Sequence, residues 1–200
     1  MLWTIPNILT VLRMALIPVF VGIFYLPQNL YALGTLPTHA LNLMAASVFA
    51  LASFTDWLDG FWARKFNQAS NFGAFLDPVA DKLMVTAALI VLVEFGRVGA
   101  VVSLIIIGRE IAISALREWM AGLGKSSSVG VALIGKIKTA AQMLAIFLLL
   151  YWDNMAGFNT QLIGHVLIVL AAFLTLLSMA YYLKAAWPII KKSIWRIYAQ

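Results

Sequence analysis

The chain has 200 residues, of which 63% are hydrophobic and only 11% are charged, whereas a soluble domain carries roughly twice that charged fraction. It contains no cysteine, which excludes disulfide bonds and thiolate metal sites. The net charge of +6 comes from basic residues interspersed among apolar segments, so we expect anionic lipid or an anionic substrate as partners and no nucleic acid.

Six apolar segments predict an all-α, polytopic membrane protein. In chain order, the predicted spans lie at about residues 8–26, 41–66, 72–95, 98–121, 131–152 and 161–185. Residues 14–55 and 154–183 contain no Asp, Glu, Lys or Arg, and each run is long enough for at least one span of about 20 residues. Residues 187–200 combine Ile and Trp with basic side chains, which predicts an amphipathic helix at the membrane surface, although a simple stop-transfer anchor fits equally well.

The distribution of Lys and Arg predicts how the chain is oriented in the membrane. An even number of spans puts both termini, and the connections after the second and fourth spans, on one side. That side holds thirteen basic residues, namely Arg13, Arg64, Lys65, Lys82, Arg109, Arg117, Lys125, Lys136, Lys138, Lys184, Lys191, Lys192 and Arg196. The other side holds Arg97 alone, and because cytoplasmic loops are enriched in Lys and Arg, we expect both termini in the cytoplasm.

Half of the eight acidic residues fall within residues 56–81. Asp56 and Asp59 are three residues apart near the end of the second predicted helix, and Asp77 and Asp81 are four apart near the start of the third. Each pair therefore faces one side of its helix, and the turn between the helices brings the two pairs together. Clustered carboxylates near a bilayer are costly unless they bind cations. Oxygen ligands without a nearby His or Cys favour Mg²⁺ or Mn²⁺ over zinc.

Small residues and one arginine lie between the two acidic pairs. Gly60, Ala63 and Gly73 would let a ligand approach the backbone, although small residues in membrane helices are also packing contacts. Arg64 can hold a phosphate through two parallel hydrogen bonds. The hydroxyl of Thr55 either contacts such a ligand or bonds to the backbone within its own helix.

Written as D-x-x-D-G-x-x-A-R-x8-G-x-x-x-D-x-x-x-D, residues 56–81 resemble the signature of the CDP-alcohol phosphatidyltransferases at every fixed position. The resemblance implies the family's six-helix membrane fold, one integral-membrane catalytic domain over residues 1–200 and a homodimer. It also implies transfer of a phosphatidyl group from a CDP-lipid to an alcohol, with release of CMP.

The same resemblance assigns roles within the signature. It implies that Asp56, Asp59, Asp77 and Asp81 bind two divalent cations, Mg²⁺ or Mn²⁺, and that Asp81 is also the general base. The residues implied to bind the CDP-lipid are Thr55, Gly60, Ala63, Arg64 and Gly73.

Two arginines in the fourth predicted span indicate a phosphorylated acceptor alcohol. Arg109 and Arg117 are eight residues apart, roughly two helical turns, and therefore share one face. Lys136 and Lys138 begin the fifth span, where ordinary anchoring at the cytoplasmic surface also explains them. A neutral acceptor such as serine would not need so many cations.

Within the family, these segments and the amino-terminal residues 5–18 are similar to bacterial members whose acceptor is sn-glycerol 3-phosphate. That resemblance implies CDP-diacylglycerol as donor, the bacterial inner membrane as location and an active site that faces the cytoplasm. It implies that the acceptor phosphate is bound by Arg109, Arg117, Lys136 and Lys138. It also places Asn7, Thr10 and Arg13 near the lipid-facing mouth of the site, with undefined roles.

Three alternatives stay open at this point. A related family member could use inositol phosphate, serine or phosphatidylglycerol as the acceptor. An intramembrane prenyltransferase also uses aspartate-rich Mg²⁺ sites, but its two acidic motifs normally lie on well-separated helices. A divalent-cation transporter would place acidic residues along a path through the bilayer, whereas here the far side offers only Glu94 and Asp153.

Overall fold

The computed structural model describes residues 5–25, 38–66, 71–122, 132–154 and 157–198. Regular structure within these ranges consists of six helices, as predicted. They are α1 (Ile5–Tyr25), α3 (Thr38–Phe66), α4 (Asn71–Glu94), α5 (Ala100–Gly122), α6 (Ala132–Tyr151) and α7 (Thr160–Tyr198). The all-α fold class is therefore confirmed.

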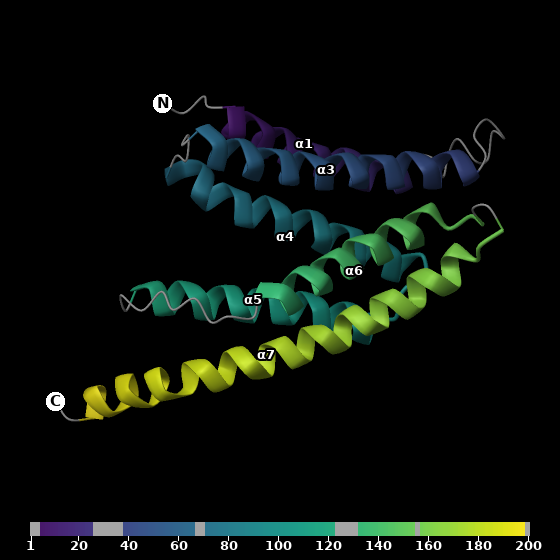
Figure 1. Ribbon diagram of the computed structural model, residues 1–200. Helices are drawn as coiled ribbons and strands as arrows, with labels where there is room; N and C mark the ends of the chain where they lie inside the picture. Colours follow the sequence, from purple (N-terminus) through teal and green to yellow (C-terminus); the bar gives the residue numbers. More distant parts are fainter. Residues whose placement is uncertain (1–4, 26–37, 67–70, 123–131, 155–156, 199–200) are drawn as a thin grey trace.

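The helices run alongside one another, with the start of α1 and the end of α7 at the same end of the bundle (Figure 1). The end of α3 and the start of α4 lie at this end, and so do the end of α5 and the start of α6 (Figure 1). The arrangement matches the alternation expected for six spans. We call this end the terminal end and the opposite one the far end. That the terminal end faces the cytoplasm stays a prediction.

The bundle is built around a continuous apolar core. Helix α1 packs against α3 and α4, α3 packs against α6, and α7 packs against α6 and α5. Large side chains such as Phe20, Phe49 and Leu89 are fully buried in this core, beside small ones such as Ala45 and Ala88. Small residues let membrane helices approach closely, because lipid supplies no hydrophobic driving force between them.

The outer surface of the helices is strongly apolar. Val101 and Leu104 on α5 are each 70% exposed, and α7 exposes Leu162, Val169 and Phe173. A soluble monomer rarely exposes such extended apolar surface, whereas lipid tails cover it without cost. Three stretches of the described residues are long and apolar enough to cross a membrane: Asn7–Tyr25, Thr38–Asp56 and Thr160–Lys184.

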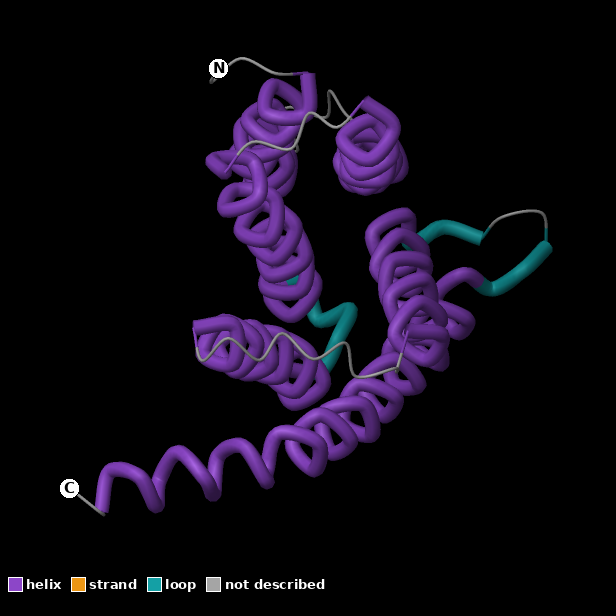
Figure 2. The backbone as a smooth tube through the Cα atoms, turned by 60° about the vertical axis from the view of Figure 1, so that its left-hand side comes forward, coloured by secondary structure: helices purple, strands orange, loops and turns teal. Residues whose placement is uncertain are grey.

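The last helix differs from the prediction. A span ending near residue 185 and a separate tail helix after Pro188 were expected, but α7 is one helix of 39 residues (Thr160–Tyr198). Its carboxyl-terminal part extends past the other helices (Figure 2). A proline removes one backbone hydrogen bond, and a membrane helix tolerates that loss where neighbouring groups satisfy the freed carbonyl. The interfacial position of residues 187–200 stays a prediction.

Arg97, the lone basic residue predicted for the far end, stabilises that end of the bundle. Its Nη1 atom donates to the carbonyl oxygens of Leu149 and Leu150 at 3.1 and 2.9 Å, and its Nη2 atom donates to Oδ1 of Asn42 at 2.7 Å. The last carbonyls of a helix have no partner within the helix, so a buried arginine is well suited to bind them. Arg97 thereby links α3 to the end of α6.

Candidate active site

Asp56 on α3 and Asp81 on α4 lie close enough together that the Asp81 carboxylate senses the charge of Asp56. Convergence of the acids from the two helices was predicted from their spacing, and these two follow it. Asp59 and Asp77 belong to the same helices, but their side chains lie outside the described part of the structure. Their participation in the site stays a prediction.

Arg13 brings a third helix to the acids. Its Nη1 atom donates to Oδ1 of Asp56 at 2.5 Å, and only 1% of the Arg13 side chain is exposed, against 42% for Asp56. Asn7 and Thr10, at preceding positions three residues apart, are also buried. The polar face of α1 therefore points into the bundle, where α1 packs against α3 and α4. The predicted place of these three residues near the lipid-facing mouth of the site stays a prediction.

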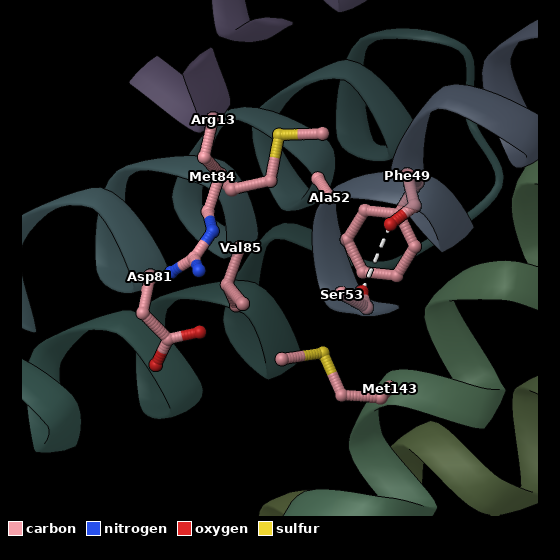
Figure 3. A pocket seen from close by; sticks show the side chains of 8 residues that line it. All are labelled: Arg13, Phe49, Ala52, Ser53, Asp81, Met84, Val85 and Met143. Atoms are coloured by element: carbon pink, nitrogen blue, oxygen red, sulfur yellow. Dashed lines mark hydrogen bonds between the residues drawn. The ribbon is translucent and has the colours of Figure 1, made fainter. Parts of the chain in front are cut away.

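A small cavity separates Arg13 and Asp81 from the apolar core (Figure 3). The guanidinium group points toward the Asp81 carboxylate, and Met143 of α6 closes the opposite wall (Figure 3). The cavity has a volume of about 10 Å³ in which the centre of a water molecule can lie, which is close to the minimum that holds one water. The cavity can therefore hold a water molecule but not a substrate headgroup.

Of the predicted CDP-lipid residues, only Thr55 has a described side chain. Its hydroxyl donates to the carbonyl oxygen of Ala52 at 2.8 Å, which is the bond within the helix that the sequence analysis left open. Its lone pairs keep an accepting role possible, and contact with the lipid stays a prediction. The other four belong to α3 and α4, and their surroundings lie outside the described side chains: Gly60, Ala63, Arg64 and Gly73.

The two arginines of α5 both reach across to α7. Nη2 of Arg109 donates to Oγ of Ser178 at 2.9 Å. Nη2 of Arg117 donates to the hydroxyl of Tyr182 at 2.8 Å, and its guanidinium lies 5.0 Å from the centre of the Tyr182 ring. The predicted shared face is confirmed, because both partners come from one helix, a single turn apart.

Lys138 of α6 joins these arginines. Its ammonium lies 3.5 Å from Oε1 of Glu110, the side chain is only 3% exposed, and it senses the positive charges of Arg109 and Arg117. The side chain of Lys136 lies outside the described residues, so its predicted role stays untested. We call Arg109, Arg117 and Lys138 the cation cluster.

The cation cluster carries more positive charge than its protein partners balance. Glu110 is the one acid seen to pair with it among the described residues. The Nε atom of Arg109 is buried and has no hydrogen-bond partner within the described part of the chain. A buried donor without a partner is costly, so the cluster is suited to a bound anion with several acceptor oxygens.

Glu110 connects the cation cluster to Asp56 and Asp81, which we call the acidic pair, because Asp81 senses the charge of Glu110 as well as that of Asp56. The two halves of the site therefore lie side by side, with the carboxylates on α3 and α4 and the cations on α5 and α6. A divalent cation and a phosphate could be held next to each other here.

Sequence reasoning missed the partners of the cations. Ser178 and Tyr182 are polar residues four apart in an apolar helix, and that spacing was the available signal. Glu110 follows Arg109 directly in the sequence, but its pairing with Lys138 depends on how α5 and α6 pack. The two histidines of the chain, His39 and His165, lie toward the far end, where His39 bonds to Asp153.

The donor chemistry fits a hard divalent cation. Asp56 and Asp81 offer only carboxylate oxygens, which Mg²⁺ and Mn²⁺ prefer. No group of three or more acidic, His or Cys side chains gathers among the described residues, which include two of the four aspartates of the signature. The donor set that the structure describes is thus half of the predicted one.

Comparison with known proteins defines the family. The sequence profile of the CDP-alcohol phosphatidyltransferases matches residues 3–189, nearly the whole chain. The chain belongs to the CDP-alcohol phosphatidyltransferase family. This membership sets aside the prenyltransferase and transporter alternatives.

Relatives in this family cover almost the full length. One from Pseudomonas fluorescens is 50% identical over 191 residues, which span 94% of this chain and 92% of the relative. Those from Shigella flexneri and Escherichia coli are 47% identical over 188 residues, 93% of this chain and 96% of each relative. All three are named CDP-diacylglycerol–glycerol-3-phosphate 3-phosphatidyltransferase.

Proposed function

We propose that this phosphatidyltransferase moves the phosphatidyl group of CDP-diacylglycerol to sn-glycerol 3-phosphate, which gives phosphatidylglycerophosphate and CMP. The names of relatives about half identical to this chain over almost its full length support the choice of substrates. The reaction belongs to the synthesis of phosphatidylglycerol. We place it in the bacterial inner membrane, in a homodimer whose active sites face the cytoplasm.

One observation carries the choice of acceptor. The cation cluster holds three positive groups beside one pairing carboxylate, and a buried Arg109 donor points to no protein partner among the described residues. Serine or a free sugar alcohol would leave that charge unbalanced, whereas the phosphate of glycerol 3-phosphate neutralises it. Lys136, two residues before Lys138, is proposed to join the cluster.

The carboxylates are proposed to act on the reacting groups themselves. A hydroxyl oxygen of glycerol 3-phosphate attacks the phosphorus that carries the diacylglycerol, and the bond from that phosphorus to the CMP oxygen breaks. Asp81 senses the charge of Glu110, the partner of Lys138, and is proposed to take the proton of the attacking hydroxyl. Gly60, Ala63, Arg64, Gly73 and Thr55 are proposed to bind the CDP-lipid.

Asp56, Asp59, Asp77 and Asp81 are proposed to hold two divalent cations, Mg²⁺ or Mn²⁺. When bound, such cations neutralise the diphosphate and the departing CMP. The chain itself supplies the position of the acceptor. A carboxylate is a weak base for an alcohol, so placing the hydroxyl close to the phosphorus contributes much of the rate.

The test is CMP release by the purified protein in detergent, with Mg²⁺ or Mn²⁺ and a panel of acceptors. The panel contains glycerol 3-phosphate, inositol 1-phosphate, serine and phosphatidylglycerol. We expect release with glycerol 3-phosphate alone, loss of release with EDTA and recovery on adding excess metal. Asp81→Asn should lower the rate at least 100-fold while the protein still folds, because it removes both a metal ligand and the base.

Each outcome separates one part of the proposal. Release with another acceptor would keep the metal site and reject the role of the cation cluster in selecting glycerol 3-phosphate. Release that EDTA leaves unchanged, or an Asp81→Asn variant with normal rate, would reject the carboxylate site.

A further inference from the structure

Arg13 lies well inside α1 (Ile5–Tyr25), and its side chain is deeply buried. Long cationic side chains usually reach out to the membrane surface and keep the charge in water. Arg13 instead leaves 1% of its side chain exposed and donates to Asp56 at 2.5 Å. A buried cation is tolerated only with a well-placed partner, so the ion pair with Asp56 is what allows Arg13 to be buried here.

The pairing is asymmetric in a way that suits a metal ligand. Arg13 binds Oδ1 of Asp56 from the buried side, while the Asp56 side chain is 42% exposed. The second carboxylate oxygen has no hydrogen-bond partner among the described residues. One oxygen is therefore fixed and the other stays available on the open side.

Arg13 also faces the second acidic helix. It lines the cavity with Asp81, its guanidinium points toward that carboxylate, and Asp81 senses its charge (Figure 3). One arginine of α1 thus lies between an aspartate of α3 and an aspartate of α4. An ion pair that served only to pack α1 on α3 would not need to approach both.

We propose that Arg13 is a positioning residue for the divalent-cation site: its guanidinium fixes the Asp56 carboxylate and leaves the second oxygen to the metal. The proposal rests on the proposed metal-binding role of Asp56 and Asp81. Partners that orient a metal-binding carboxylate typically contribute 10- to 100-fold to metal affinity. Arg13 acts through Asp56 and is not assigned contact with either substrate.

The experiment measures Mn²⁺ binding by the purified full-length protein in detergent, from the electron paramagnetic resonance signal of free Mn²⁺. This readout does not depend on turnover or on the acceptor. Arg13→Lys keeps the charge but loses the planar donor geometry. We expect it to weaken Mn²⁺ binding roughly 10- to 100-fold, and Arg13→Gln to weaken it as well.

Arg97→Lys is the matched control, because Arg97 is another buried arginine that bonds to protein acceptors but lies at the far end. It should lower the melting temperature and leave Mn²⁺ affinity within about twofold of wild type, since it lies far from the acids. Unchanged Mn²⁺ affinity in a folded Arg13→Lys variant would overturn the proposal. Tighter binding in Arg13→Gln would also overturn it, because Arg13 would then compete with the metal.

A double variant keeps the test decisive if removing one partner prevents folding. Arg13→Gln with Asp56→Asn removes both charges, so no buried ion is left without a partner. We expect Arg13→Gln to change the Mn²⁺ affinity much less in the Asp56→Asn background than in wild type, because the main effect of Arg13 runs through Asp56. A loss as large as the one in the wild-type background would reject that route. Wild-type protein that binds no Mn²⁺ would overturn the metal site itself, which is a different failure from unchanged binding in the Arg13 variants.

Discussion

Arg109 and Arg117 are held in place by hydroxyl groups of α7. Their spacing along one helix predicted a shared face, and the structure directs both guanidinium groups to α7, where Ser178 and Tyr182 accept their hydrogen bonds. Hydroxyl partners orient an arginine without neutralising it. The positive charge therefore stays available to an anionic ligand.

Arg109→Ala should raise the KM for glycerol 3-phosphate far more than the KM for CDP-diacylglycerol. A hydrogen bond to a charged group contributes about 1.5–3 kcal/mol, so the increase should be roughly 10- to 100-fold. Steady-state kinetics of CMP release with each substrate varied in turn gives both constants. Lys184→Ala, which removes an exposed cation of α7, is the control and should change neither. Equal effects of Arg109→Ala on both constants would count against acceptor binding.

Residues within one helix were easier to predict than contacts between helices. The shared face of Arg109 and Arg117 follows from helical periodicity alone, and the structure confirms it. The bond from Arg13 to Asp56 and the pairing of Lys138 with Glu110 depend on how helices are aligned side by side. A single sequence carries no direct signal for that alignment.

At the scale of helices, most boundaries were predicted within a few residues. Charged clusters, glycines and the uncharged runs defined the ends of α3, α4 and α5, because a long apolar stretch in a membrane protein has to be helical. The exception is α7: its apolar span ends at Lys184, close to the predicted residue 185, but the helix itself continues to Tyr198. Proline is a weaker break in a long apolar helix than it is in a soluble one.

The α6–α7 contact depends on a glycine. A Cβ atom at Gly164 would lie 2.8 Å from Cγ of Leu149, so the two helices touch at this point. Gly164→Ala should therefore lower the melting temperature in detergent, because overpacking costs about 1–3 kcal/mol and exceeds the gain of about 1 kcal/mol in helix propensity.

Gly108 provides the matched control, since a Cβ atom there meets no heavy atom within 4 Å. Gly108→Ala should leave the melting temperature unchanged or raise it. Adding Leu149→Ala to Gly164→Ala should recover little, because it trades the clash for a lost core side chain. Equal stabilisation by alanine at both glycines would show that α6 and α7 do not approach closely at Gly164.

At the scale of the whole molecule, the two ends of the bundle have different tasks. The acidic pair and the cation cluster lie toward the terminal end, where their charges are available to bind a metal ion and a phosphate. The far end is closed by contacts within the protein: Arg97 binds α3 and α6, His39 bonds to Asp153, and Tyr25 bonds to Glu94. Stability and chemistry are thereby separated along the helix axes, and a variant at the far end can serve as a control for one at the site.

Because the two ends of the bundle differ, the orientation of the protein in the membrane can be tested by labelling one cysteine at each end. The natural chain has no cysteine, so any single introduced cysteine is the only target for a maleimide. Gly122 at the end of α5 and Phe158 between α6 and α7 are both exposed, and they lie at opposite ends of the bundle.

Gly122→Cys should react with a membrane-impermeant maleimide in inverted vesicles and not in spheroplasts, because the terminal end is predicted to face the cytoplasm. Phe158→Cys should show the reverse pattern. Labelling of Gly122→Cys from the outside of spheroplasts would invert the topology and put the acids and the cation cluster on the side away from cytoplasmic glycerol 3-phosphate.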